Sequence, residues 1–356
     1  MNTSAYTRNF TRRPLQSGLS LIELMISITI GLLILSSLTA LFVNQSQIRS
    51  ELDKTNRMID NGRYALDVVS ENLRMAGFYG EPNPGVLVAG ALPDPCSVTL
   101  GDISASIPYF IQGYNAASVT DAATSPPACI PASVKAGSDI LVIRRVDTSN
   151  VGESQNAITQ ASAVAAATTI PYLQISQCQY DPVSPRYKVG NNPASFTLRQ
   201  RNCTQTSTTP YADLRRMIVQ IYFIDSNNQA GDGIPTLKRI ELSSAGNLTT
   251  VPLVEGIEYM QIEYGLDANT DGNADSYIAS PVVANWPNIM SVKINIISRN
   301  IDLSAGHNES KTYSLGGSPA ITFTPATTDH YKRHAYTQIV RLVNPSGLRE
   351  TLNEKP

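Results

Sequence analysis

Short oxygen-bearing side chains recur at alternate positions between residues 267 and 275. Carboxylate and amide oxygens are the ligands that Ca²⁺ prefers, and a glycine at the sixth position of a loop permits the tight turn that brings them together. Gly272 stands at that sixth position, but the twelfth is Ile278 instead of the bidentate glutamate that completes common calcium loops. The stretch therefore predicts either a weak Ca²⁺ site or a polar turn between two strands, since aspartate, asparagine and glycine also favour turns. The candidate metal ligands are Asp267, Asn269, Asp271, Asn273 and Asp275.

Other side chains suited to catalysis or metal binding are few. His330 and His334 are four residues apart and follow Asp329, but their neighbourhood is typical of a loop that enters a strand, so we expect no metal site there. The sequence contains no serine nucleophile elbow and no phosphate-binding loop. It therefore predicts a protein that is not an enzyme and requires no cofactor, with Ca²⁺ as the one candidate ligand.

A single carboxylate, Glu23, interrupts the apolar segment near the N-terminus. No residue from Leu24 to Val43 is charged, and at about 1.5 Å per residue this run spans about 30 Å, the thickness of a bilayer core. Arginines and no acids occur in residues 1–18, a charge pattern that keeps the N-terminus in the cytoplasm. The run is too long for the core of a secretory signal peptide, and no small-x-small cleavage site follows it. A plain membrane anchor leaves Glu23 unexplained, because an unpaired carboxylate in an apolar helix costs a few kcal/mol.

The residues from Gly18 to Leu24, Gly-Leu-Ser-Leu-Ile-Glu-Leu, resemble the class III signal of type IV prepilins and pseudopilins. The resemblance implies that a prepilin peptidase cleaves between Gly18 and Leu19 and methylates the new amine of Leu19, where leucine replaces the commoner phenylalanine. Glu23 then holds the fifth mature position, at which a glutamate can pair with the ammonium of a neighbouring subunit. Because pairing recovers much of the cost of burying either charge alone, cleavage would convert a membrane protein into an assembly-competent subunit.

The helix that begins in the apolar run is expected to continue beyond it. We expect residues 1–18 to be a leader that is removed, residues 19–43 to be the transmembrane and assembly helix, and residues 44–77 to be an amphipathic continuation. In that continuation, apolar or small residues recur at alternating steps of four and three, which places them on one helix face that can pack on a sheet. They are Ile48, Leu52, Thr55, Ile59, Gly62, Leu66, Val69, Leu73 and Ala76.

Four further segments are similar to the PilW family of minor pilins. They are Gly62–Leu66, Leu73–Gly80, Gly137–Arg144 and Val254–Gly265. Many members have a cysteine directly after the Gly-Phe-Tyr-Gly turn, where this chain has Glu81, so the family's disulfide pairing is not carried over. The resemblance implies a low-copy subunit, and a place at the filament tip has room for a head as large as residues 78–356.

The cysteines stand apart from any C-x-x-C pair, which argues against a zinc or thioredoxin-like site. They are Cys96, Cys129, Cys178 and Cys203. An even number in an exported domain indicates disulfides, and three pairings are possible. We favour the pairing of sequence neighbours, Cys96 with Cys129 and Cys178 with Cys203, with four buried free thiols as the alternative.

Residues 78–356 are expected to form a β-rich globular head. Residues 78–137 are predicted to be mostly loops, and residues 147–210 are a candidate inserted lobe. Long strands without intervening helices predict antiparallel sheets, and with the long helix they give an α+β, pilin-like fold. The strands expected from alternating and β-branched patterns are 139–146, 215–225, 236–243, 257–264, 289–299 and 335–343.

The net charge of −2 and the lack of a basic patch with interleaved aromatic residues predict that no nucleic acid is bound. The leading hypothesis is a minor pilin that takes part in initiating type IV pilus assembly near the filament tip. A J-type minor pseudopilin of a type II secretion system and a tip adhesin are the alternatives. The implied partners are other minor pilins, the major pilin, prepilin peptidase and the inner-membrane assembly platform, with a large tip adhesin as a further candidate. The implied location is the inner membrane, with a cytoplasmic N-terminus and a periplasmic head, and then the pilus tip at the cell surface.

Overall fold

The computed structural model describes residue 18 and residues 20–80, 90–149, 170–181, 185–192, 195–203, 211–243 and 246–353. The chain divides into two units, Met1–Asp53 and Lys54–Pro356, and each is described by itself.

The first unit contains the start of helix α1, which runs from Leu21 to Arg74. Among the described residues, α1 is long and apolar enough to cross a membrane by length and composition, with a mean hydropathy of 2.3 over an 18-residue window. Its residues 21–43 are exposed in the single chain. The helix predicted over residues 19–77 is therefore confirmed from Leu21 onward, and Leu19 itself lies outside the described residues.

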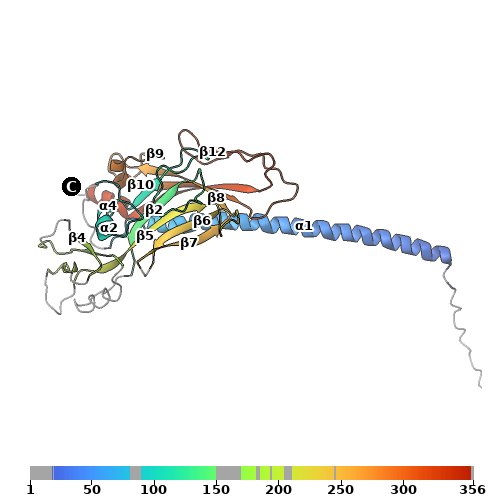
Figure 1. Ribbon diagram of the computed structural model, residues 1–356, viewed down its shortest axis with the longest axis horizontal. Coiled ribbons are helices and arrows are strands. Elements are labelled where there is room, and N and C mark those ends of the chain that lie inside the picture. The colour runs from blue at the N-terminus through green and yellow to red at the C-terminus, as the bar shows by residue number, and fades with distance from the viewer. Residues whose placement is uncertain are drawn as a thin grey trace, which may run out of the picture. The chain divides into compact units, whose positions relative to one another are not determined.

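The second unit is built on a seven-stranded antiparallel sheet (Figure 1). Its strands follow the order β1-β2-β5-β3-β4, so β5 lies between β2 and β3, and β6 pairs with both β5 and β7 off this path. The strands are β1 (Ile111–Tyr114), β2 (Ile140–Val146), β3 (Tyr172–Ile175), β4 (Tyr187–Gly190), β5 (Leu214–Asp225), β6 (Thr236–Leu242) and β7 (Leu248–Glu255).

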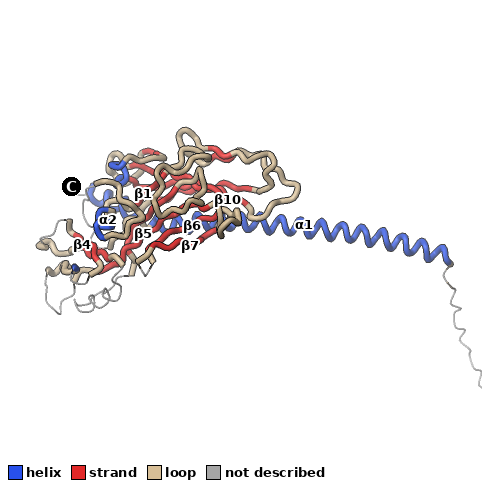
Figure 2. Tube along the Cα trace, in the orientation of Figure 1, coloured by secondary structure: helices blue, strands red, loops and turns tan. Residues whose placement is uncertain are grey.

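A second antiparallel sheet has the order β13-β10-β8-β9, and two short strands, β11 and β12, pair with each other. Their bounds are β8 (Ile257–Leu266), β9 (Ser276–Ile278), β10 (Ile289–Arg299), β11 (Tyr313–Ser314), β12 (Thr322–Phe323) and β13 (Arg333–Arg341). Apart from the end of α1, the described helices of this unit are short (Figure 2). They are α2 (Leu100–Ala105), the 3-10 helix η2 (Val283–Asn288) and α4 (Val343–Asn353).

The end of α1 and both sheets share one apolar core. Leu66 and Leu73 of α1 belong to the same buried cluster as Tyr222 of β5 and Val292 of β10. Gly62 is needed in this packing, because a Cβ there would lie 2.3 Å from the ring of Tyr336 on β13. The helix is thus held in the head by burial of one face, as its sequence period predicts.

The predicted helix face is buried only in part. Its later members Gly62, Leu66, Val69, Leu73 and Ala76 are buried, whereas Ile48 and Leu52 are 60% and 57% exposed. The early members lie in the first unit, where the single chain offers them no sheet to pack on. Their exposed apolar surface therefore remains for lipid or another chain to cover.

The α+β fold with antiparallel sheets is confirmed, and each of the six expected strands is present within a few residues of its predicted bounds. Residues 90–137 are mostly loops, as expected, apart from α2 and β1. The candidate lobe 147–210 stays a prediction: its strand β3 pairs with β5 of the main sheet, and residues 150–169 lie outside the described residues.

Candidate processing and assembly site

The start of α1 is closed by reciprocal contacts between Ser20 and Glu23. The backbone N–H of Ser20 donates to Oε2 of Glu23 at 2.9 Å, and the N–H of Glu23 points to Oγ of Ser20 at 3.4 Å. This is a capping box, in which two backbone donors that lack helical partners are satisfied by side chains. It also places a carboxylate at the positive end of the helix dipole. The sequence pattern Ser-x-x-Glu could have revealed this cap, but our sequence interpretation assigned Glu23 only to pairing between subunits.

Gly18 is exposed and open on every side, with no atom within 4 Å of a Cβ built on it. Leu19, the residue expected to carry the methylated amine, lies outside the described residues. The bond between Gly18 and Leu19 immediately precedes the capped helix end, so a new amine at Leu19 would be close in sequence to the Glu23 carboxylate.

Hydroxyl groups along the apolar run have their hydrogen bonds satisfied within the helix. Ser27 donates to the carbonyl of Glu23 at 2.7 Å, and Thr39 donates to that of Leu35 at 2.8 Å. Thr29, Ser36 and Ser37 donate in the same way to carbonyls three or four residues back. Because lipid offers no hydrogen-bond partners, this arrangement removes most of the cost of placing these hydroxyls in a bilayer.

Both disulfides favoured from the sequence are present. Cys96 bonds to Cys129 and Cys178 bonds to Cys203, and no free cysteine remains. The first bond closes a loop of the region before β2, and the second closes the segment that contains β4. Each therefore closes a loop-rich stretch of the head.

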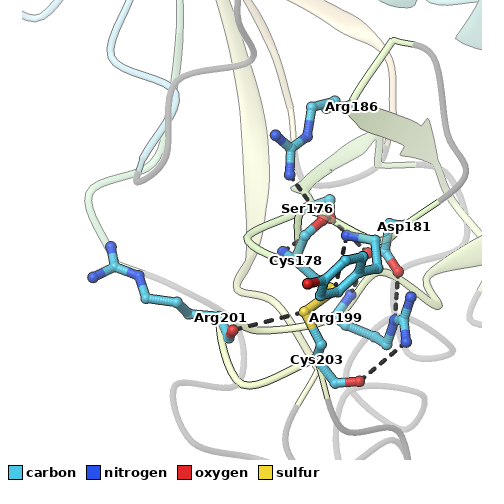
Figure 3. Close-up of a disulfide and its surroundings, with 8 residues drawn as sticks. Ser176, Cys178, Asp181, Arg186, Arg199, Arg201 and Cys203 are labelled. Carbon is cyan, nitrogen blue, oxygen red and sulfur yellow. Dashed lines mark hydrogen bonds and ion pairs between the residues drawn. A yellow bond between two sulfur atoms is a disulfide. The ribbon is translucent and has the colours of Figure 1, made fainter.

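Polar contacts surround the second disulfide (Figure 3). Asp181 accepts from Nε of Arg199 at 2.5 Å and from the backbone N–H of Arg199 at 3.0 Å, and Ser176 donates to it at 2.5 Å. Burial raises the pKa of the Asp181 carboxyl, but these hydrogen bonds outweigh it and hold the pKa below its ordinary value. Arg199 also donates to the carbonyl of Cys203 at 3.0 Å, so the ion pair joins both ends of the closed loop.

The loop between β8 and β9 is closed by its own backbone and by a cation from α4. Asp267 is 1% exposed and accepts from the N–H groups of Thr270 at 2.7 Å and Gly272 at 3.0 Å. Arg349 of α4 donates to the same carboxylate at 2.9 Å. A guanidinium thus already balances the charge of the first predicted calcium ligand. This partner lies 82 residues away in the chain, where no local sequence pattern indicates the contact.

The remaining predicted ligands also bond within the loop. Asp275 accepts from the N–H of Ala268 at 2.7 Å, and Asn269 donates to Asp271 at 3.2 Å and to Asp275 at 3.3 Å. Asn273 contributes its N–H to Asp271 at 2.7 Å. In the part of the chain that the structure describes, no group of three or more His, Cys, Asp or Glu side chains is arranged to hold a metal. Calcium binding by this loop stays a prediction, and a cation would have to displace Arg349 from Asp267.

The histidines have separate partners. His330 donates from Nδ1 to the carbonyl of His307 at 2.5 Å, whereas the ring of His334 lies edge-on to that of Tyr336. His334 is within β13 and His330 precedes it, as the sequence indicated.

Two family models match this chain. Residues 13–39 match the prokaryotic N-terminal methylation motif, the stretch that contains Gly18, Glu23 and most of the uncharged run. Residues 221–344 match the family described as Type IV Pilus-assembly protein W, a stretch that runs from β5 to the start of α4 and includes the whole second sheet. Together the two matches support a type IV minor pilin of the PilW family. Its methylation motif and apolar N-terminal helix fit a membrane-anchored pilin.

The other comparisons are more distant. No curated protein matches the chain. Among solved structures, the type IV-like pilin TTHA1219 from Thermus thermophilus is similar, with 11% sequence identity and a TM-score of 0.23. That match covers 53% of this chain and 96% of the other.

Proposed function

We propose that this PilW-family protein is a prepilin that is cleaved between Gly18 and Leu19 by prepilin peptidase and methylated on Leu19. The match of residues 13–39 to the methylation motif carries the proposal. Gly18 is exposed and precedes the start of α1 at Leu21, so the glycine that the peptidase would recognise is accessible. Cleavage replaces a neutral amide with an ammonium, and that new charge gives Glu23 of a neighbouring subunit an ionic partner.

The mature protein then takes part in initiating type IV pilus assembly near the filament tip, together with other minor pilins and the major pilin. The match of residues 221–344 to the PilW model supports a pilus role over a role in a type II secretion pseudopilus. The apolar surface left exposed along residues 21–52 of α1 supports a place among other pilin helices, because a helix that is apolar all round is stable only when lipid or protein covers it.

N-terminal sequencing of the mature protein tests the processing step. We expect it to begin at Leu19, and we expect Gly18→Ala to slow processing so that precursor accumulates in the membrane. Ser17→Ala is the matched control, since it changes a neighbouring small residue and leaves the glycine in place. A mature protein that begins elsewhere would refute the assignment.

A deletion strain tests the assembly role. We expect loss of surface pili and of twitching motility with normal protein secretion, restored by the wild-type gene. Normal pili with defective type II secretion would instead identify a J-type pseudopilin, and normal pili with loss of attachment alone would identify an adhesin.

A further inference from the structure

A groove of about 540 Å³ lies where α1 ends against the sheet. It is lined by Met75, by residues 216–220 of β5 and by Glu241 of β6. Arg145 and Asp147 line it from β2 and the residues just after it. A cavity of this volume is large enough to hold one or two side chains of another chain.

Arginines outnumber carboxylates around the groove. Arg145 and Arg216 line it, and Arg239 lies close enough to Arg145 to lower its pKa, after the larger effect of burial. The carboxylates are Asp147 and Glu241. The lining itself has two guanidiniums and two carboxylates, and Arg239 beside it is a third guanidinium.

Two of these guanidiniums, those of Arg145 and Arg216, have no carboxylate within hydrogen-bond distance among the described residues. Arg239 pairs with Glu241 at 2.8 Å, but Arg216 is 3.6 Å from Asp147, beyond hydrogen-bond distance. Arg145 has no carboxylate within ion-pair distance among the described residues. Its hydrogen bonds are long, 3.3 Å to the carbonyl of Val146 and 3.5 Å to Oδ1 of Asn72, and its Nε has no acceptor in the described part of the chain.

The negative end of the α1 dipole offsets part of this charge, because Arg145 lies beside the last turn of the helix. That effect is weak at an exposed helix end. A carboxylate that forms two parallel hydrogen bonds with a guanidinium binds more strongly, since charge-assisted hydrogen bonds are stronger than the interaction with the dipole. The dipole is therefore a weaker partner for these arginines than a carboxylate bound by two parallel hydrogen bonds would be.

We propose that this groove binds an acidic side chain of a neighbouring pilin subunit, with Arg145 and Arg216 as its ligands. The inference rests on the proposed function only for the source of that side chain. The planar fork of arginine matches a carboxylate, and the loose hold on both side chains lets them turn toward one that enters. Arg239 and Glu241 stay paired with each other and define the edge of the site.

The test is direct binding of a fluorescein-labelled tri-glutamate peptide to the full chain in detergent micelles, measured by fluorescence anisotropy at low and physiological salt. We expect saturable, salt-sensitive binding that Arg145→Gln weakens at least about tenfold, in line with loss of charge-assisted hydrogen bonds. Arg201→Gln is the matched control, because it removes the same charge from an exposed position outside the groove, and it should bind like wild type. Melting curves of each variant show that it is folded.

Three results would overturn the inference: no binding of the peptide, equal binding by wild type and Arg145→Gln, or binding of inorganic phosphate with none of the peptide. In cells, Arg145→Gln should lower the amount of this chain in sheared pili while cleavage after Gly18 is unchanged. Cleavage and peptide binding are measured separately. If the wild-type chain is never cleaved after Gly18, the proposed function is wrong. If Arg145→Gln is cleaved and enters pili at the wild-type level, only the proposed role of the groove is wrong.

Discussion

Glu23 caps a helix in the single chain and has a proposed second role in the filament. In the single chain its carboxylate accepts the N–H of Ser20 and caps α1. In the proposed filament the same carboxylate faces an ammonium from another subunit, a stronger partner than a backbone amide in a low-dielectric core. The cap therefore holds Glu23 near the helix start until that partner arrives.

We expect Glu23→Ala to insert in the membrane normally and to fail in assembly. Insertion should be intact because the change removes a charge from an apolar helix. Ser20→Ala separates the two roles of Glu23, since it weakens the cap and keeps the carboxylate. Quantifying each variant in membranes and in sheared pili should show loss from pili for Glu23→Ala and near-normal incorporation for Ser20→Ala. Wild-type incorporation of Glu23→Ala would remove the pairing mechanism.

Asp139 is a buried carboxylate that links the two sheets. It is 1% exposed at the start of β2, and its two oxygens accept from the N–H groups of Ala116 and of Ile262 on β8, each at 2.8 Å. Burial raises the pKa of Asp139 to about 8, against the lowering effect of these two amides. A raised pKa in the folded state means that the fold binds a proton that the unfolded chain has released.

This raised pKa predicts that Asp139 lowers the stability of the head as the pH rises from about 4 to about 8. The slope from this group is at most about 1.4 kcal/mol per pH unit. Urea unfolding across that range should show a smaller fall for Asp139→Asn, which does not titrate, than for wild type. Asp121→Asn, at an exposed position, should follow wild type. A pH-independent difference between wild type and Asp139→Asn would mean that the carboxylate stays ionised in the fold.

Prediction of single residues from sequence is possible where the pattern is local. Gly18 and Glu23 are five residues apart and both lie in the stretch that matches the methylation motif, while their roles in cleavage and assembly stay predictions. Arg349 and Asp139 were missed as parts of a site because their partners come from other elements. Asp267 and Arg349 meet only when α4 folds back onto the β8–β9 loop, and no local pattern reports that contact.

At the scale of elements, helix α1 is buried in the head only along its second half. Leu73 is fully buried between the sheets, whereas Leu52 of the same helix is 57% exposed. We expect Leu73→Ala to cost about 2–5 kcal/mol, the usual cost of a leucine-sized cavity. Leu52→Ala, the same change at an exposed site, should leave the unfolding midpoint of the head unchanged. Equal effects of the two variants would contradict the packing described for α1.

The β8–β9 loop and α4 form a second pair of interdependent elements. Arg349→Met should destabilise the head by about 3–5 kcal/mol, because it leaves the Asp267 carboxylate buried without its cation. If the loop binds calcium, the Asp267 carboxylate that this variant frees should bind the ion more readily. The melting temperature of the variant should then rise more than that of wild type when chelator is replaced by millimolar calcium. Asp271→Ala in the same background is the control for non-specific ion effects. No response in either chain would show that the loop is a polar turn.

The strands that sequence patterns predicted are the ones with long apolar or alternating runs, such as β5 and β10. The strands that the sequence patterns did not predict are short or lie at a sheet edge. β7 forms an edge, is mostly exposed on one face and contains Pro252, which an edge strand tolerates and a pattern search rejects. β3 has only four residues, too few to show a period. Their existence depends on the neighbouring β6 and β5, which supply the hydrogen-bonding partners.

For the whole molecule, the membrane signal and the disulfides imply the same compartment. A head that is delivered across the inner membrane meets oxidising conditions, where disulfides form and persist. Each bond closes a loop, with sequence separations of 33 and 25 residues, and such loops stabilise a fold by about 3–4 kcal/mol each. The oxidation state of the cysteines in living cells therefore reports where the head is.

We expect no cysteine of the full chain to react when cells are denatured in a thiol-labelling reagent without reductant. Cys178→Ser should expose one thiol, that of Cys203, and leave Cys96 and Cys129 unlabelled, which checks the pairing as well as the oxidation. A chain that lacks residues 1–45 has lost its apolar segment, so it should stay in the reducing cytoplasm and label at all four positions. Reduction of the purified full chain should lower its melting temperature, because both loop closures are lost. Four labelled thiols in the full chain would mean that the head never leaves the cytoplasm, and that α1 does not deliver it across the membrane.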